Sequence, residues 1–385
     1  MFGDLWFEDY VKKGNDIWFA AGNYNGVYKF NTISKEVKRI ATFPGEPMTK
    51  DWAFRRIKLW EDKLVFMPVY ADSVFVLDTK SEVLERFSIL EENELIVYQH
   101  KCKFQCYEIY GDWLYIIGSE YPGIIKVNLK DHQVIKLADI PEMAYSKSIE
   151  GYFGNEIVVK ESILYITCPS SNRILLLDMR TDCFEEIEVG SRSNRYNGIC
   201  EIEDAYYLKV CDNDNLIRWD QKDGSCREIV LEFNIHFYDR KICRTQNYLW
   251  VFSYFTNEVY RMNHKGECIS KILLDHSENR VWLVFCEETP EGIYFLNLNS
   301  GSWHFLKEDG TDEDLHFIMK EPDKGIIEHF LMDSQIKNWI VLEENYTFPV
   351  ELLLLKIFEE EKEKKKEKLG NDFGKRIYEN IRGKM

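Results

Sequence analysis

The sequence predicts an all-β fold, a seven-bladed β-propeller followed by a C-terminal helical tail. Three observations predict it: a strand-rich segment recurs seven times, its copies start 42 to 50 residues apart, and each copy reads as four short strands separated by turns. A composition of 45% hydrophobic and 15% aromatic residues is sufficient for a large core. We therefore expect a propeller over residues 1–343 and a helical extension over residues 344–385.

The repeat is defined by columns of similar residues that need no gaps within a copy. The second residue of the unit is aromatic in six of the seven copies, and the residues ten and thirteen places after its start are apolar in all seven. Copies start at Ile17, Leu64, Leu114, Leu164, Tyr206, Leu249 and Ile293. Each start opens a strand rich in aromatic and β-branched residues, such as "DIWFA" at 16–20.

Turns follow the strands at fixed places in each copy. Four- or five-residue turns such as "GNYNG" and "PSSNR" join this strand to a second apolar run. An Asn or Asp then ends that run in six copies, and its short side chain can cap the backbone of a further turn. An amphipathic strand such as "EVKRIATF" follows, and another, such as "RRIKLW", precedes the unit, which makes four strands per repeat.

Two segments resemble known propeller repeats. In "LIRWD", Trp219 and Asp220 stand where a WD repeat has its dipeptide, and "VFVLDTKSEVLERF" is similar to YVTN-type strands. The chain thus resembles the broad superfamily of WD-repeat, kelch-like and YVTN-like propellers over residues 4 to 320. The Gly-His of WD repeats, the double glycine of kelch repeats and the sialidase-type Asp box are absent. The resemblance implies the fold and no particular activity.

The ends of the chain decide how the ring closes. Few residues precede the first strand "LWFEDYVKK", so we expect no N-terminal strand to join the last blade; "DEDLHFIM" is the preferred outer strand of that blade and "NWIVLEE" the alternative. In the tail, Pro349 suits a first helical turn, and an apolar face is formed by Leu352, Leu353, Leu355 and Phe358. We expect this helix to pack on the propeller, or alternatively to dock a partner or a membrane surface.

Charge and composition exclude several classes of protein. The net charge of −17 argues against general nucleic-acid binding, which depends on Lys and Arg contacts to phosphate. No apolar run of 18 residues and no leader pattern is found, so we expect no transmembrane segment and a cytoplasmic location. The ten cysteines form no C-x-x-C pair, which favours small buried side chains in a reducing compartment.

A candidate site lies where the chain enters each innermost strand, because these segments and the hairpins between second and third strands should surround one mouth of the central channel. An aromatic residue followed by a large polar one occurs nine to eleven residues before six of the seven repeat starts. After the first blade, nine-residue windows over these segments hold ten basic and five acidic residues. Two interpretations stay open: aromatic wedges between blades with polar caps on strand ends, or a ring of hydrogen-bond donors for a ligand.

If these segments form a ring of hydrogen-bond donors, their basic, aromatic and amide residues are the candidates for ligand binding. Arg side chains fit planar anions such as carboxylate and phosphate, and aromatic faces suit sugar rings. The segment "SRSNRYNG" gathers two guanidinium groups, a ring and an amide. The candidates are Arg55, Arg56, Lys103, Arg192, Arg195, Tyr196, Asn197, His236, Arg240 and Arg280.

The favoured function is a non-catalytic recognition module that binds a protein, a peptide or an anionic saccharide at this mouth. The alternative is a propeller enzyme, a lyase or hydrolase, acting on an anionic or carbohydrate substrate there. His100, His236 and His276 could converge on a metal or act as general bases, but no pair has metal-ligand spacing. Asp212 and Asp214 of "CDNDN" suit an Asx-rich turn better than a calcium site. We therefore expect no cofactor and no metal.

Overall fold

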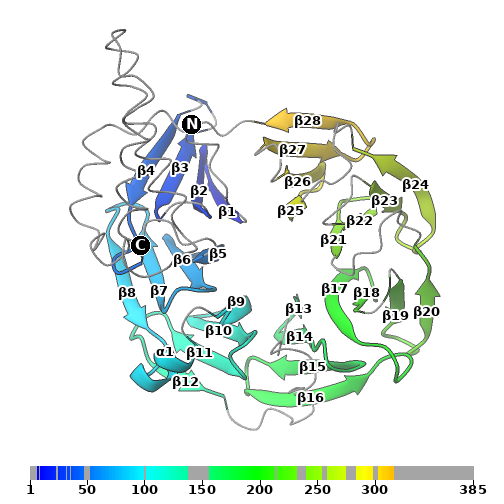
Figure 1. Ribbon diagram of the computed structural model, residues 1–385, viewed down its shortest axis with the longest axis horizontal. Helices are drawn as coiled ribbons and strands as arrows, with labels where there is room; N and C mark the ends of the chain where they lie inside the picture. The colour runs from blue at the N-terminus through cyan, green and yellow to red at the C-terminus, as the bar shows by residue number, and fades with distance from the viewer. Residues whose placement is uncertain are drawn as a thin grey trace, which may run out of the picture. The chain divides into compact units, whose positions relative to one another are not determined.

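The computed structural model describes residues 7, 9–22, 25–31, 33–34, 36–46, 53–98, 101–137, 156–211, 213, 215–231, 240–253, 258–274, 283–297 and 302–315. Within them lie seven four-stranded antiparallel sheets, each built from four consecutive strands. Figure 1 shows the sheets arranged around a central channel, with the first strand of each sheet innermost. This confirms the predicted seven-bladed β-propeller.

The strands match the repeat, because every repeat start falls in the second strand of a sheet. Blade 1 comprises β1 (Tyr10–Lys13), β2 (Asp16–Ala20), β3 (Val27–Asn31) and β4 (Val37–Ala41), and blade 2 comprises β5 (Phe54–Trp60), β6 (Lys63–Pro68), β7 (Ser73–Asp78) and β8 (Leu84–Ser88). Blade 3 comprises β9 (Phe104–Tyr110), β10 (Trp113–Gly118), β11 (Ile124–Asn128) and β12 (Val134–Lys136), and blade 4 comprises β13 (Ile157–Lys160), β14 (Ile163–Thr167), β15 (Arg173–Asp178) and β16 (Cys183–Glu188). Blade 5 comprises β17 (Tyr196–Ile202), β18 (Ala205–Val210), β19 (Leu216–Asp220) and β20 (Cys226–Ile229). Blade 6 comprises β21 (Arg240–Arg244), β22 (Leu249–Ser253), β23 (Glu258–Met262) and β24 (Cys268–Leu273), and blade 7 comprises β25 (Leu283–Glu288), β26 (Gly292–Asn297), β27 (Ser302–Lys307) and β28 (Asp312–Leu315).

The ring closes without a shared strand between the first and last blades in the described residues. The preferred segment "DEDLHFIM" supplies β28, the outer strand of blade 7, while the N-terminal β1 belongs to blade 1. Both expectations about closure are confirmed. Residues Asp4–Lys320 form one compact unit. The predicted boundary at residue 343 and the predicted tail helix lie outside the described residues.

The turns form as the Asn and Asp column predicts. Oδ1 of Asn31 accepts hydrogen bonds of 3.0 Å from the backbone N–H groups of Ile33 and Ser34. The same Asx turn recurs at equivalent places, at Asp78, Asn128, Asp178, Asp220 and Asn263. Because the capping oxygen belongs to the last strand residue, each blade fixes its own turn locally.

One short helix interrupts the β pattern, and the sequence prediction does not include it. α1 (Glu92–Val97) lies between β8 and β9. The backbone N–H of Glu91 donates to Glu94 Oε2 over 3.0 Å, which caps its first turn. Leu95 and Tyr98 pack against the core between blades 2 and 3. No helix in the described part of the chain is long and apolar enough to cross a membrane.

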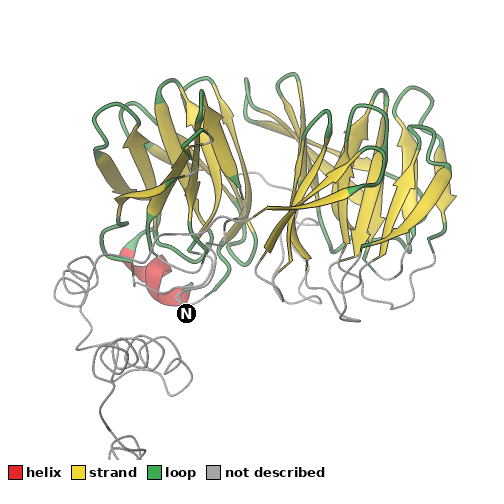
Figure 2. Cartoon of the chain, turned by 90° about the horizontal axis from the view of Figure 1, so that it is seen from above, coloured by secondary structure: helices red, strands yellow, loops and turns green. Residues whose placement is uncertain are grey.

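The hydrophobic core lies between the blades rather than at the centre. In the described residues each pair of neighbouring blades encloses its own cluster of buried side chains, seven clusters in all. Figure 2 shows why: the sheets stand side by side, face against face, with their strands running between the two ends of the ring. The predicted apolar columns supply these faces, for example Val27, Leu77 and Val127.

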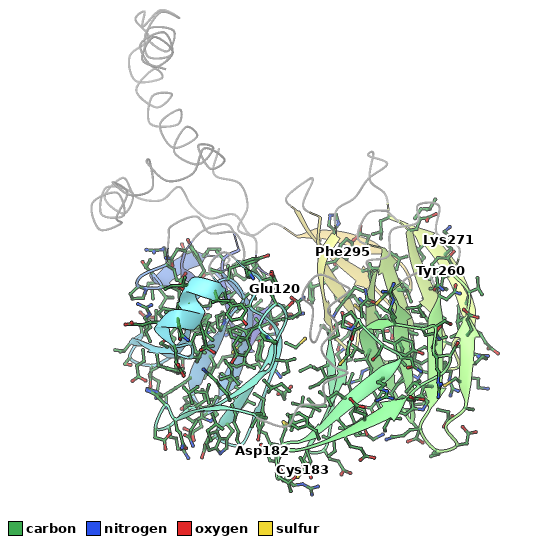
Figure 3. The ribbon with its side chains drawn as sticks, turned by 60° about the horizontal axis from the view of Figure 1, so that its bottom comes forward. Glu120, Asp182, Cys183, Tyr260, Lys271 and Phe295 are labelled. Carbon is green, nitrogen blue, oxygen red and sulfur yellow. The ribbon has the colours of Figure 1, made fainter. Side chains whose placement is uncertain are left out.

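A cation reinforces several of these faces. Lys126 on β11 lies over the rings of Trp113 and Tyr115, with Nζ 4.4 and 5.2 Å from their centroids. The same Nζ lies 2.7 Å from Oδ2 of Asp182, in the outer turn of blade 4, which Figure 3 labels. Tyr115 also donates from its hydroxyl to Oδ1 of Asp182 over 2.9 Å. The side chain of Lys126 is almost buried, so this pair joins blades 3 and 4 from within the interface.

We expect Lys126→Met and Asp182→Asn each to lower the free energy of unfolding by about 2 kcal/mol, because each leaves the other partner of a largely buried pair unmatched. The double variant should lose less than the sum of the two, and denaturant melts would measure this coupling. Asn is chosen because Asp182 has a φ of 58°, which Asn tolerates. Lys222→Met, which removes an exposed partner of Asp204, is the control and should leave the melt unchanged. Strictly additive losses would contradict this account of the interface.

Candidate functional site

The segments that lead into the innermost strands, here called the mouth segments, are tied by backbone hydrogen bonds to the hairpins of their own blades. The carbonyl of Lys103 accepts the N–H of Ser119 over 2.8 Å, and that of Arg195 accepts the N–H of Cys211 over 2.8 Å. Ala53 makes the equivalent bond to Val69 over 2.9 Å. Mouth segments and hairpins therefore share one face of the ring, as the sequence analysis expects.

A β-bulge occurs near the start of four innermost strands, and in three of them it falls at the same place in the repeat. The pairing of β5, β9 and β17 with their neighbours skips one residue each: Arg55, Gln105 and Asn197. These are the polar residues nine places before the repeat starts. A bulged residue leaves the ladder and turns its side chain out of the regular alternation, and bulges are frequent beside binding sites. The polar column in the sequence thus corresponds to a repeated irregularity of the backbone.

The aromatic residues of the mouth segments are buried between blades. Phe7, Phe54, Phe104 and Tyr196 are each at most 3% exposed. Phe54 lies 4.1 Å from Phe43 between ring centroids, and the Tyr196 hydroxyl donates to the carbonyl of Val189 over 2.9 Å. These four rings fit the interpretation as wedges, and they do not line the mouth.

One residue of each blade lies eight places before the repeat start, in the innermost strand or directly before it; we call this the ring position. Its members in blades 1 to 6 are Asp9, Arg56, Cys106, Glu156, Gly198 and Lys241. Two of them are carboxylates and two are cations, and the charges of Arg56, Glu156 and Lys241 all act on the Cys106 thiol. Burial, the largest effect, raises the pKa of Cys106 to about 12, so this thiol stays protonated.

Glu156 joins blades 4, 5 and 6. Its Oε1 lies 3.2 Å from Nζ of Lys241 and 3.5 Å from Nζ of Lys209, and its Oε2 accepts the backbone N–H of Ile199 over 3.2 Å. Burial alone would raise the pKa of Glu156, but Lys209, Lys241 and Arg56 together hold it below its ordinary value. Glu156 is therefore the ionised centre of a three-blade contact.

Asp9 makes the equivalent contact among blades 1, 2 and 3. Its Oδ2 accepts the backbone N–H of Ile57 over 3.1 Å and the hydroxyl of Tyr107 over 3.3 Å. Here burial dominates and raises the pKa of Asp9, and Arg56 opposes it only in part. In both contacts the carboxylate accepts the N–H that lies seven residues before the next repeat start. A carboxylate that accepts a backbone N–H of the next blade thus joins blades 1–3 and also blades 4–6. The pKa of the carboxyl group is raised in the first contact and lowered in the second.

Gly198 makes room for the second contact. It pairs with Lys209 across β17 and β18, and a Cβ at Gly198 would lie 2.0 Å from Lys209 Cε and 2.6 Å from Glu156 Oε2. The missing side chain lets the lysine stem cross its own inner strand. Lys209 consequently reaches Glu156 although it belongs to the second strand of the blade.

The structure separates the predicted site residues into groups. Lys103 is fully buried: its Nζ donates to the carbonyl of Tyr70 over 2.6 Å and lies 2.9 Å from Asp72 Oδ1. Tyr196 is equally buried. Arg56 faces the ring position beside Asp9, Arg192 is exposed, and Arg195 and Asn197 are half-buried. Arg55 is the second residue of β5 and Arg240 is the first residue of β21, but the structure does not describe their side chains. The other candidates lie outside the described residues: His236 and Arg280, and also His100, His276, Asp212 and Asp214.

The sequence reasoning missed Asp9, Glu156 and Lys209 as members of the site. The ring position holds acids, bases, a thiol and a glycine, so it shows no shared residue type as a column. The residue eight places before each repeat start directly follows the polar column. Inspecting that residue in each copy would have identified Asp9 and Glu156 as candidates. Lys209 could not be found this way, because its approach depends on the glycine opposite it. In the described part of the chain, no group of three His, Cys, Asp or Glu residues is placed to hold a metal ion.

Solved structures share this fold at low sequence identity. Virginiamycin B lyase from Staphylococcus aureus has a TM-score of 0.57 and 12% identity over 77% of this chain and 92% of its own. The β-propeller domain of Cps50 (Swd1) from Myceliophteria thermophila gives 0.54 and 11% over 79% and 96%, and BamB from Moraxella catarrhalis gives 0.52 and 13% over 76% and 82%. No family model and no curated protein matches the sequence. The fold occurs in enzymes and in binding scaffolds alike, so it does not decide the function.

Proposed function

We propose that the protein is a recognition module whose mouth binds an anionic partner, either an acidic peptide segment of a protein or an anionic saccharide. The observation that supports it most is the gathering of Arg56, Lys209 and Lys241 around the channel of a chain whose net charge is −17. The exposed Arg192 and the half-buried Arg195 lie in the mouth segment that leads into β17 of blade 5. Cations placed against an oppositely charged background attract and orient anions.

The bulges add the groups that would give specificity. Asn197 supplies an amide beside Arg195, and Gln105 supplies another on blade 3. An amide both donates and accepts hydrogen bonds, whereas a guanidinium group only donates. This mixture suits a ligand that carries carboxylates together with hydroxyl or peptide groups. Lys103 and Tyr196 support the mouth from within the core.

One observation favours the second candidate, a lyase or hydrolase for an anionic or carbohydrate substrate at the same mouth. Asp9 and Glu156 occupy the same ring position, yet the pKa of Asp9 is raised and that of Glu156 is lowered. Two carboxyl groups whose pKa values shift in opposite directions are the arrangement that general acid–base chemistry uses. The two candidates share the mouth and differ in whether the bound ligand is altered.

We expect the double variant Arg192→Ala/Arg195→Ala to bind a polyglutamate peptide or hyaluronan oligosaccharides roughly tenfold more weakly than the wild type, because two charge-assisted contacts are lost. Isothermal titration at low and high salt measures this, and wild-type affinity should fall as salt rises. The control Lys130→Ala/Lys222→Ala removes two exposed cations from the turns between third and fourth strands. Equal binding by both double variants would contradict the proposal, and new saccharide products in the wild-type mixture would favour the enzyme.

A further inference from the structure

The interface between blades 7 and 1 differs from the other interfaces of the ring. Seven residues before the repeat start, blades 2, 3, 5 and 6 place Ile57, Tyr107, Ile199 and Ile242, each at most 6% exposed, and blade 4 places the half-buried Ile157. Blade 1 has Tyr10 there, and it is only half-buried. At the interface between blades 7 and 1, the side chain at this place is therefore a partly exposed aromatic ring.

Blade 7 differs from blades 1, 3 and 6 at the residue that covers the aromatic side chain of the repeat. Lys29, Lys126 and Arg261 lie over Trp18, Tyr115 and Trp250. The equivalent residue of blade 7 is Phe305, which stacks on Tyr294 with centroids 4.4 Å apart and planes at 29°. An uncharged ring thus stands at the interface between blades 7 and 1 at the place where blades 1, 3 and 6 have a cation.

A groove of about 480 Å³ lies at this interface, and we call it the seam groove; its lining is Tyr10, Lys12, Thr289, Glu291, Tyr294 and Phe305. Tyr10 and Tyr294 meet at 82° with centroids 6.4 Å apart, so their rings form a corner. The volume falls within the range of small-molecule sites, roughly 300–1,000 Å³. Lys12 near the end of β1 and Glu291 between β25 and β26 place the groove at the end of the ring opposite the mouth.

The polar side chains at the edge of the seam groove restrict the charge and the hydrogen-bonding groups of a ligand. Lys12 is exposed and can only donate hydrogen bonds, while the exposed Glu291 can only accept them when ionised. Thr289 is occupied by its own turn, since its hydroxyl donates to the carbonyl of Gly292 over 2.9 Å. A net charge on the ligand would be attracted by one edge residue and repelled by the other. Hydroxyl groups satisfy both residues, because a hydroxyl donates and accepts.

We propose that the seam groove binds a neutral saccharide, whose C–H face stacks on the aromatic rings while its hydroxyls bond to Lys12 and Glu291. Aromatic side chains provide large apolar faces with fixed geometry, which is the surface that the flat face of a sugar ring contacts. This site is separate from the mouth in position and in ligand charge. High salt, which weakens anion binding at the mouth, should leave saccharide binding at the seam groove unchanged.

The test is a titration of the whole chain with maltose, cellobiose and diacetylchitobiose, followed by saturation-transfer NMR and calorimetry. At least one disaccharide should bind at millimolar or lower concentration, and Lys12→Met or Glu291→Gln should weaken it roughly tenfold. Tyr294→Leu should abolish the aromatic-stacking signal of the sugar C–H protons. The matched controls Lys130→Met and Glu185→Gln change exposed residues elsewhere on the ring and should bind as the wild type does.

Three results would overturn the proposal. Absence of binding by all three disaccharides is the first, and binding that Lys12→Met and Glu291→Gln leave unchanged is the second. The third is preference for L-phenylalanine, a zwitterion with an aromatic ring, over every saccharide. Lys12 and Glu291 are exposed, so their variants should keep the wild-type melting temperature and report on binding alone.

Discussion

Replacing Glu156 by Gln should lower the free energy of unfolding by about 3 kcal/mol at neutral pH, the largest loss we expect from a single charge in this protein. The substitution leaves Lys209, 3% exposed, and Lys241, 18% exposed, without the carboxylate that lies between them. Removing one partner of a buried ion pair costs more than the pair contributes, because the remaining charge stays desolvated. Urea denaturation followed by tryptophan fluorescence measures the loss.

The pH dependence of the free energy of unfolding should also show that Glu156 stabilises the fold in its ionised form. The pKa of Glu156 is lower in the folded protein than in the unfolded chain, so its stabilisation is complete at neutral pH and disappears as the pH falls through the folded pKa. The difference between wild type and Glu156→Gln should therefore shrink on acidification. A difference that grows towards low pH would contradict the assignment of Glu156 as the ionised group.

Asp9→Asn is the matched control, because it changes the same ring position in blade 1. Burial raises the pKa of Asp9, so the charged form is disfavoured in the folded state, and the stabilisation by its protonated form is lost as the pH rises. Asn can still accept the N–H of Ile57, and we expect equal or higher stability than the wild type at neutral pH. Lys241→Met combined with Glu156→Gln should recover part of the loss, which shows that the unpaired lysine causes it.

The contrast between these two carboxylates shows what the sequence can and cannot predict. The strands and turns depend on local patterns, so the repeat columns predict all seven blades, the Asx turns and the closing strand β28. The direction of a mouth side chain depends on its neighbours in other blades. From the sequence, Lys103 is expected to be a ligand-binding residue at the mouth. In the structure its side chain is buried, and its Nζ contacts the carbonyl of Tyr70 and the carboxylate of Asp72 in blade 2. Such contacts between distant residues leave no periodic signal.

The ring position illustrates the same limit within a single column. Asp9 and Glu156 are chemically alike and stand at equivalent places, and their pKa values still shift in opposite directions. The cause is the second strand of the next blade: Lys209 reaches Glu156 across Gly198, while Arg56 and Lys58 only partly offset the burial of Asp9. A side chain at residue 198 would meet Lys209 and Glu156, and the repeat columns give no sign of this requirement.

Replacing Gly118 by Ala should cost about 3 kcal/mol, the second of the largest effects, because the new Cβ would meet backbone that cannot move aside. Its ideal position lies 1.8 Å from the carbonyl oxygen of Tyr121 and 2.8 Å from that of Gly123. The N–H of Gly118 donates to Gly123 over 2.8 Å, so the hairpin is held closed at this point. Relief of the clash requires opening the hairpin of blade 3.

Opening the hairpin of blade 3 should also change the conformation of the mouth segment. The carbonyl of Lys103 accepts the N–H groups of Ser119 and Tyr121 from the same hairpin, over 2.8 and 3.2 Å. A displaced hairpin therefore shifts the mouth segment that carries Lys103 and Gln105. Equivalent positions in other blades hold Ala21, Pro68, Cys168 and Val210, so the need for glycine is specific to blade 3.

Gly111→Ala separates steric clash from backbone strain in the same blade. Gly111 has a φ of 61° with no atom within 4 Å of the ideal Cβ, so its substitution should cost only about 1 kcal/mol. Denaturant melts of the two variants compare the mechanisms directly. If Gly118→Ala were no more destabilising than Gly111→Ala, the hairpin would be able to relax, and the mouth of the channel would be more adaptable than its backbone hydrogen bonds indicate.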